Sequence, residues 1–143
     1  MPYMPAGMPI PDVKDPQYKD WWAFCKQHKL VIQRCAECGT FRHLPDILCY
    51  KCHSFKYEWH PVSGKGVVYS YIIPYHPAHP ALKGRVPYNV VIVELSDAGN
   101  VRMVGNIVDC PNEQVKVGMP VEVTWEDVND SVTLPQWKLS NHK

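Results

Sequence analysis

Two cysteine pairs are the residues of this sequence whose spacing most clearly predicts chemistry. Cys35 and Cys38 form one CxxC pair, and Cys49 and Cys52 form a second pair after ten intervening residues. Because each pair can turn two sulfurs toward one point, four thiolates at this spacing predict a closed tetrahedral metal site. Gly39, directly after the first pair, suits the positive φ angle that such a turn often needs.

Zinc is the expected ion, in a structural role, because four cysteine ligands leave no open position for a water or a substrate. Sulfur-only tetrahedral sites also hold iron, so a rubredoxin-type redox centre stays open as an alternative. His43 and His53 lie close to the pairs, and we expect them to face solvent or to support the ligands from outside. Two disulfides, or four unrelated buried thiols, are the remaining interpretation. Cys25 and Cys110 have no evident base or cationic cluster beside them and are predicted to be inert.

The composition places the chain among globular proteins. It has 143 residues, of which 45% are hydrophobic, and its fourteen prolines favour short β-segments and loops. A net charge of +1 provides no overall field toward nucleic acid or an anionic membrane, so we expect neither as a partner. The sequence has no signal peptide and no apolar run of about 20 residues, which predicts a cytoplasmic protein with reduced cysteines.

The elements that must position the metal site begin with residues 1–30, an arm followed by a helix. Residues 1–13 carry four prolines and three methionines without periodicity, which predicts an extended or disordered arm. A helix is predicted from Asp15-Pro16 to about Leu30. Its aromatic face includes Trp21 and Trp22, which we expect either to pack on the rest of the chain or to dock into a groove of a partner protein.

The remaining chain predicts a ribbon and then a barrel. Short strands entering and leaving the metal site define a ribbon over residues 31–61, whose folding free energy should come mostly from the ion. From residue 62 to 143 the sequence alternates in five short β-runs, which favours a partly open OB-fold barrel, although a sandwich fragment would give a similar pattern. The predicted fold class is therefore α+β and mainly β, with an N-terminal helix, a rubredoxin-like zinc ribbon and a C-terminal OB-fold barrel.

The longest predicted loop, residues 74–87, connects the first two strands of the barrel and holds four prolines. Loops of this length in compact domains are often functional. His76, His79, Lys83 and Arg85 are candidate contacts for an anionic ligand such as a CoA phosphate or a substrate carboxylate. A solvated loop with no specific role is the alternative.

The order of these motifs resembles the acyl-CoA-associated zinc-ribbon and OB-fold protein family. The resemblance covers nearly the whole chain from Tyr18, and it departs at residues 44–47, where the family commonly has prolines followed by arginine. It is carried by the segments RCAECG at 34–39, CYKCHS at 49–54, GKGVVYS at 64–70, PY at 87–88 and VGMPVEV at 117–123.

The resemblance implies a non-catalytic accessory subunit of a heteromeric thiolase or thiolase-like aldolase. Such a subunit stabilises a thiolase-like catalytic partner and shapes its acyl-CoA site, with structural Zn²⁺ in the ribbon and acyl-CoA bound in the complex. Small subunits of thiolases acting on aromatic acyl-CoA intermediates, such as benzoylsuccinyl-CoA thiolase, are the nearest functional analogues. A nucleic-acid-binding ribbon and OB module, or a stand-alone acyl-CoA-binding protein, are the alternatives. Catalysis by this chain alone is not expected, because four cysteines are committed to metal.

Overall fold

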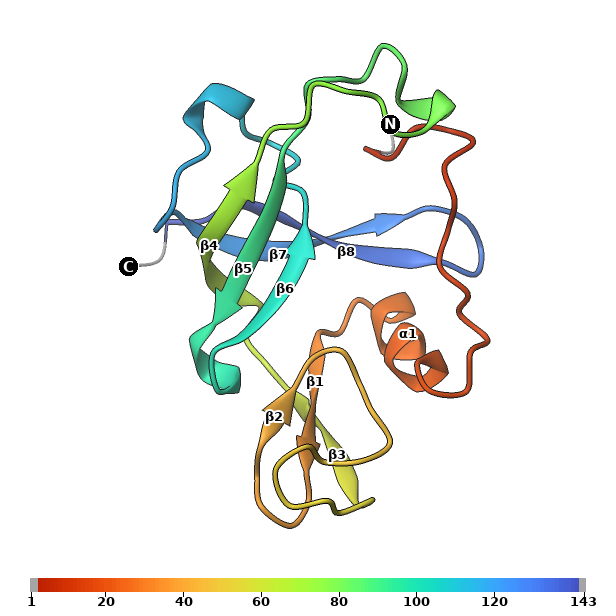
Figure 1. Ribbon diagram of the computed structural model, residues 1–143, viewed down its shortest axis with the longest axis vertical. Helices are drawn as coiled ribbons and strands as arrows, with labels where there is room; N and C mark the ends of the chain where they lie inside the picture. The colour runs from red at the N-terminus through yellow and green to blue at the C-terminus, as the bar shows by residue number, and fades with distance from the viewer. Residues whose placement is uncertain (1–2, 142–143) are drawn as a thin grey trace.

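The structure is a computed structural model that describes residues 3–141. Met1 and Pro2 at the start of the predicted arm, and His142 and Lys143 at the end of the predicted barrel, lie outside the described residues. One α-helix, three short 3₁₀ helices and eight strands make up the described chain. Figure 1 shows a small ribbon sheet next to a larger curled sheet, with the arm running past the larger sheet to the helix. This arrangement confirms the predicted fold class.

The ribbon is a three-stranded antiparallel sheet in the order β2-β1-β3. Its central strand β1 (Val31–Cys35) pairs with β2 (Phe41–Arg42) on one side and with β3 (Tyr57–Pro61) on the other. The first metal-binding pair therefore begins at the last residue of β1. The chain between β2 and β3 carries the second pair, so the sheet brings both pairs to one end of the ribbon.

The helix α1 (Lys19–Lys26) ends about one turn before the predicted boundary near Leu30. It stops because His28 adopts a left-handed conformation with φ of 59°. The Lys29 N–H then donates back to the Phe24 carbonyl at 3.0 Å, which closes a Schellman motif. Glycine usually occupies this left-handed position, so no ordinary stop signal marks the end of the helix in the sequence.

The barrel is a curled sheet of five antiparallel strands in the order β6-β5-β4-β7-β8. All five β-runs expected from the alternation are present as strands. Beyond the end of β6, hydrogen bonds from the Trp137 N–H to the Asn106 carbonyl and from the Val108 N–H to the Trp137 carbonyl partly close the seam with β8. The strands are β4 (Lys65–Ile72), β5 (Val90–Leu95), β6 (Val101–Gly105), β7 (Pro120–Asp127) and β8 (Thr133–Leu139).

A glycine at the start of β4 allows the sheet to curl tightly. A Cβ atom on Gly66 would lie 2.6 Å from Val93 Cγ1 and 2.8 Å from the Glu94 carbonyl oxygen. Contacts this short do not occur for real side chains, so the close approach of β4 to β5 requires glycine at this position. Gly64, two residues earlier, has φ of 81° and forms the turn that leads into the first strand of the barrel.

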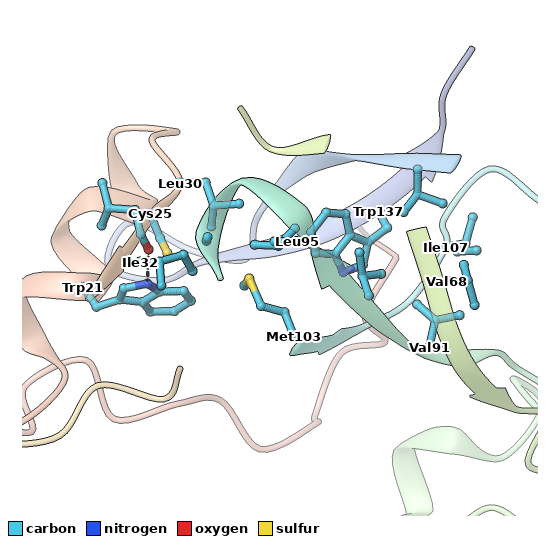
Figure 2. Packing of buried hydrophobic residues seen from close by; sticks show 14 of the residues in the cluster. Trp21, Cys25, Leu30, Ile32, Val68, Val91, Leu95, Met103, Ile107 and Trp137 are labelled. Atoms are coloured by element: carbon cyan, nitrogen blue, oxygen red, sulfur yellow. Dashed lines mark hydrogen bonds between the residues drawn. The ribbon is translucent and has the colours of Figure 1, made fainter. Parts of the chain in front are cut away.

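The helix, the ribbon and the barrel share one hydrophobic core. Figure 2 shows Trp21, Cys25 and Ile32 from the N-terminal part of the chain beside Leu95 and Met103 of the barrel. Trp21 is only 4% exposed, and its indole N–H donates to the carbonyl of β1 residue Val31 at 2.9 Å. Burial raises the pKa of the Cys25 thiol to about 12. The ribbon is therefore packed against the barrel rather than tethered to it.

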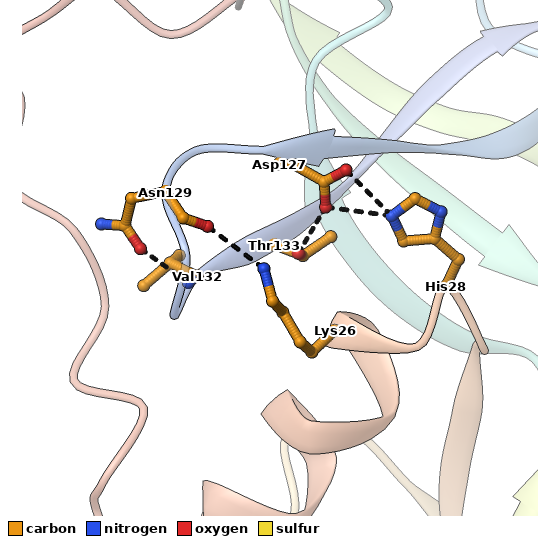
Figure 3. Close-up of polar contacts among 6 residues, drawn as sticks. All are labelled: Lys26, His28, Asp127, Asn129, Val132 and Thr133. Carbon is orange, nitrogen blue, oxygen red and sulfur yellow. Dashed lines mark hydrogen bonds and ion pairs between the residues drawn. The ribbon is translucent and has the colours of Figure 1, made fainter.

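A polar junction joins the end of α1 to the β7–β8 hairpin (Figure 3). The His28 Nε2 atom lies 3.0 Å from the Asp127 carboxylate, which also accepts a 2.6 Å hydrogen bond from the Thr133 hydroxyl. These two hydrogen bonds, the first being the stronger influence, lower the pKa of Asp127. Lys26 adds a 3.2 Å hydrogen bond to the Asn129 carbonyl. The junction links the end of the helix to the β7–β8 edge of the barrel.

Candidate functional site

The four paired cysteines meet at one point at the end of the ribbon. Their Sγ atoms all lie within 4.8 Å of one another, with 3.5 Å between Cys35 and Cys52 and 3.6 Å between Cys38 and Cys49. A zinc ion bound tetrahedrally by sulfur at about 2.3 Å requires sulfurs about 3.8 Å apart. The donor set therefore fits a tetrahedral ion of the size of zinc.

Two equivalent turns bring the sulfurs together. The Gly39 N–H donates to the Cys35 carbonyl at 3.0 Å, and the His53 N–H donates to the Cys49 carbonyl at 2.9 Å. Gly39 has φ of 75° and His53 has φ of 63°, so both residues take the left-handed position that follows a pair. His53 is exposed and does not belong to the sulfur cluster, and its role in the structure is to complete the second turn.

The neighbours of the cysteines shift the pKa values of individual thiols in the cluster. The Thr40 hydroxyl lies 3.0 Å from Cys38 Sγ and lowers the pKa of this thiol to about 6. The Ser54 N–H favours the thiolate of Cys52, but burial and the neighbouring sulfurs outweigh it and raise the pKa of Cys52 to about 12. The neighbouring sulfurs thus oppose the ionisation of Cys52, and a cation among them would favour its thiolate. The described cysteines form no disulfide.

The candidate residues of the 74–87 loop do not gather into one site. The His79 Nδ1 atom accepts the Ala81 N–H at 3.1 Å and caps the short 3₁₀ helix Pro80–Leu82. His76 and Lys83 are exposed to solvent. Arg85 alone among the four reaches another segment, because its guanidinium donates a hydrogen bond to the Tyr3 carbonyl. A ligand role for these four residues stays a prediction.

The two tryptophans of α1 occupy different environments. Trp21 packs into the shared core, whereas the half-buried Trp22 keeps surface of its own. Trp22 lies on the wall of a groove of about 600 Å³ between α1 and the barrel, with Leu44 and Val104 among the other lining residues. Trp21 therefore suits the expectation of packing on the rest of the chain, and Trp22 suits the expectation of a surface for a partner. Docking of a partner through this helix stays a prediction.

The mouth of the barrel is a site that the sequence did not indicate. Four arm residues line a cavity of about 450 Å³ together with barrel residues such as Tyr88 and Ile107; they are Tyr3, Met4, Pro5 and Met8. The Met4 N–H donates a 2.8 Å hydrogen bond to the carboxylate of Glu126, a residue that is only 8% exposed. Arm and barrel partners are separated by more than 80 residues in the sequence, so no local pattern could have revealed the contact.

Within residues 3–141, no helix combines the length and the apolar character needed to cross a bilayer.

Comparison with known proteins identifies related chains. Residues 22–58 match the rubredoxin-like zinc ribbon domain of ChsH2, and residues 59–126 match the C-terminal OB-fold domain of ChsH2. A DUF35 domain-containing scaffold protein of Methanocaldococcus jannaschii is 34% identical over 80% of this chain and 82% of its own length. A chain of a solved Ltp2-ChsH2(DUF35) aldolase is 38% identical, with a TM-score of 0.80, over 90% of this chain and 98% of that one.

A probable enoyl-CoA hydratase alpha subunit of Thermomonospora curvata is 42% identical over 118 residues, which is 82% of this chain. The aligned part is 36% of the hydratase subunit, so this chain spans about a third of that relative.

Proposed function

This chain belongs to the DUF35/ChsH2 family of zinc-ribbon and OB-fold proteins, and from that membership we propose that it is the non-catalytic subunit of a heteromeric enzyme acting on acyl-CoA thioesters. The similarity to the chain of the Ltp2-ChsH2(DUF35) aldolase carries the proposal, because it extends over 98% of that chain. The proposed organisation is an arm and helix over residues 1–30, a ribbon over 31–61 and an OB barrel over 62–143.

The proposed partner is a catalytic subunit of thiolase-like type. The names of the relatives favour an aldolase or a hydratase-type enzyme over a thiolase in the strict sense. An aromatic acyl-CoA is the proposed substrate. The ribbon would hold structural Zn²⁺ through its four cysteines, while the barrel and its 74–87 loop would face the partner's acyl-CoA site.

The thiol inventory supports a non-catalytic role for this chain. Cys25 is 1% exposed and has its pKa raised to about 12, and burial with the nearby Asp109 charge raises the pKa of Cys110. The other four cysteines form the metal cluster. No described cysteine is thus available as the thiolate nucleophile that thiolase chemistry needs.

The proposal is tested by assaying the purified, zinc-loaded chain alone and with its co-purified partner. We expect no formation or cleavage of an acyl-CoA carbon–carbon bond by the chain alone, and activity with the partner present. Catalysis by the chain alone would refute the non-catalytic assignment. Equal activity of the partner with and without this chain would refute the assignment as an accessory subunit.

A further inference from the structure

One peptide group of the arm is held from both sides at the mouth of the barrel. The carbonyl of Tyr3 accepts a hydrogen bond from the Arg85 guanidinium, and the N–H of Met4 donates to the Glu126 carboxylate at 2.8 Å. This carbonyl and this N–H belong to the same peptide unit. A cationic donor and an anionic acceptor therefore bracket a single secondary amide, and both hydrogen bonds are of the stronger, charge-assisted kind.

The acceptor side of this pair is fixed by the barrel itself. Glu126 on β7 also accepts a 3.2 Å hydrogen bond from the side-chain amide of Gln136 on β8. Gln136 is only 5% exposed, and it is held in turn by Asn106, whose N–H donates to it at 2.8 Å. A buried carboxylate requires donors, and the barrel supplies one from a side chain while the arm supplies a main-chain N–H.

Outside this one peptide group, the arm has little buried contact with the barrel. None of residues 3–8 is buried, and none belongs to a strand. A cavity of about 450 Å³ lies beside the arm at the mouth. Segments with few buried contacts open at low free-energy cost, so the arm can leave while the barrel stays folded.

We propose that Arg85 and Glu126 form a clamp for a secondary amide, which the chain's own Tyr3–Met4 peptide fills until the pantetheine arm of an acyl-CoA thioester displaces it. This inference rests on the proposed function, which supplies the class of ligand. Pantetheine carries two secondary amides joined by methylene groups, and side chains such as Met8, Leu82 and Ile107 offer apolar contacts for such methylenes. The cavity has the size of ordinary small-molecule sites, about 300–1,000 Å³.

The arm and the ligand compete in this arrangement, so freeing the clamp should strengthen binding. Met4→Pro removes the N–H that the arm donates to Glu126 and leaves the clamp residues intact. Titration of pantetheine into the zinc-loaded full chain, followed by amide NMR shifts, should give a Kd about tenfold lower for Met4→Pro than for the unaltered chain. Ala6→Pro, in the exposed part of the same arm, is the control and should leave the Kd unchanged.

The clamp itself is tested by Arg85→Met, with Lys116→Met as a charge-matched control at an exposed site outside the cavity. Arg85→Met should weaken pantetheine binding at least tenfold in the Met4→Pro background, whereas the control should bind normally. Equal binding by both variants would overturn the proposal. Binding of CoA without binding of pantetheine would also overturn the proposal, because it would indicate phosphate recognition. Binding of a partner's peptide, but not of pantetheine, would overturn it as well.

Co-purification of a catalytic subunit separates this inference from the proposed function. A chain that retains its partner but never binds pantetheine contradicts the clamp alone. A chain that binds pantetheine but has no catalytic partner contradicts the proposed subunit role and leaves the clamp standing.

Discussion

His43 makes the stability of this fold depend on pH in a way that can be worked out from its surroundings. It follows β2 at the junction of the ribbon and the barrel, where its ring centre lies 5.3 Å from that of Trp21. Its Nδ1 atom is enclosed and has no hydrogen-bond partner among the described residues. Burial of this ring lowers the pKa of His43 to about 4, because the protonated form would lose its water without gaining a partner.

The sign of the effect follows from the direction of this shift. In the unfolded chain a histidine has a pKa of about 6.5, so as the pH falls the unfolded state takes up the proton first. The contribution of His43 to stability is therefore complete above about pH 6.5, declines as the pH falls toward 4, and is constant below that. Between pH 7.5 and pH 5.5 the free energy of unfolding should fall by about 1.3 kcal/mol through this residue.

Urea unfolding of the zinc-loaded chain at these two pH values measures the effect. His43→Leu keeps an apolar side chain at the junction but cannot titrate, so the variant should lose about 1.3 kcal/mol less than the unaltered chain over the same pH interval. Each protein gives one change in the free energy of unfolding between the two pH values. Subtracting one change from the other removes the contribution of the other histidines and any pH-independent cost of the substitution. Equal pH dependence in both proteins would refute the reasoning.

Three further substitutions test other parts of the account. Cys49→Ser should abolish 1:1 zinc binding and unfold the ribbon, seen as loss of near-ultraviolet dichroism, and normal metal content would contradict the four-sulfur site. Gly66→Ala should destabilise the barrel by about 2–3 kcal/mol in urea, because the added Cβ would meet the Glu94 carbonyl at 2.8 Å. Gly84→Ala, where no atom lies within 4 Å of the added Cβ but φ is 81°, should cost only about 1 kcal/mol. Equal costs at the two glycines would show that the close approach of β4 to β5 is not tight.

The metal cluster could be predicted because its determinants are local. The spacing within Cys35–Cys38 and Cys49–Cys52 encodes the turns that point the sulfurs inward, and alternation likewise revealed the five strands of the barrel. Local rules failed where an unusual residue took a special conformation. His28 ends α1, and His53 completes the second metal turn, both at φ near 60°, although neither is a glycine.

The barrel mouth could not be predicted, because its parts are brought together only by the fold. Arg85 was a candidate from its loop, but its contact with Tyr3 spans 82 positions, and that of Glu126 with Met4 spans 122. The sequence also did not reveal that Trp21 and Trp22 of α1 lie in different environments. Trp21 lies in one buried cluster with Leu30 and Ile32, which follow the turn after the helix.

Affinity purification of the tagged chain from its native cell extract tests the central claim most directly. Mass spectrometry of the eluate and metal analysis should find one zinc per chain and a near-stoichiometric aldolase, hydratase or thiolase-type subunit. A chain that elutes alone, or with nucleic acid, would contradict the proposal that it is the accessory subunit of an acyl-CoA enzyme.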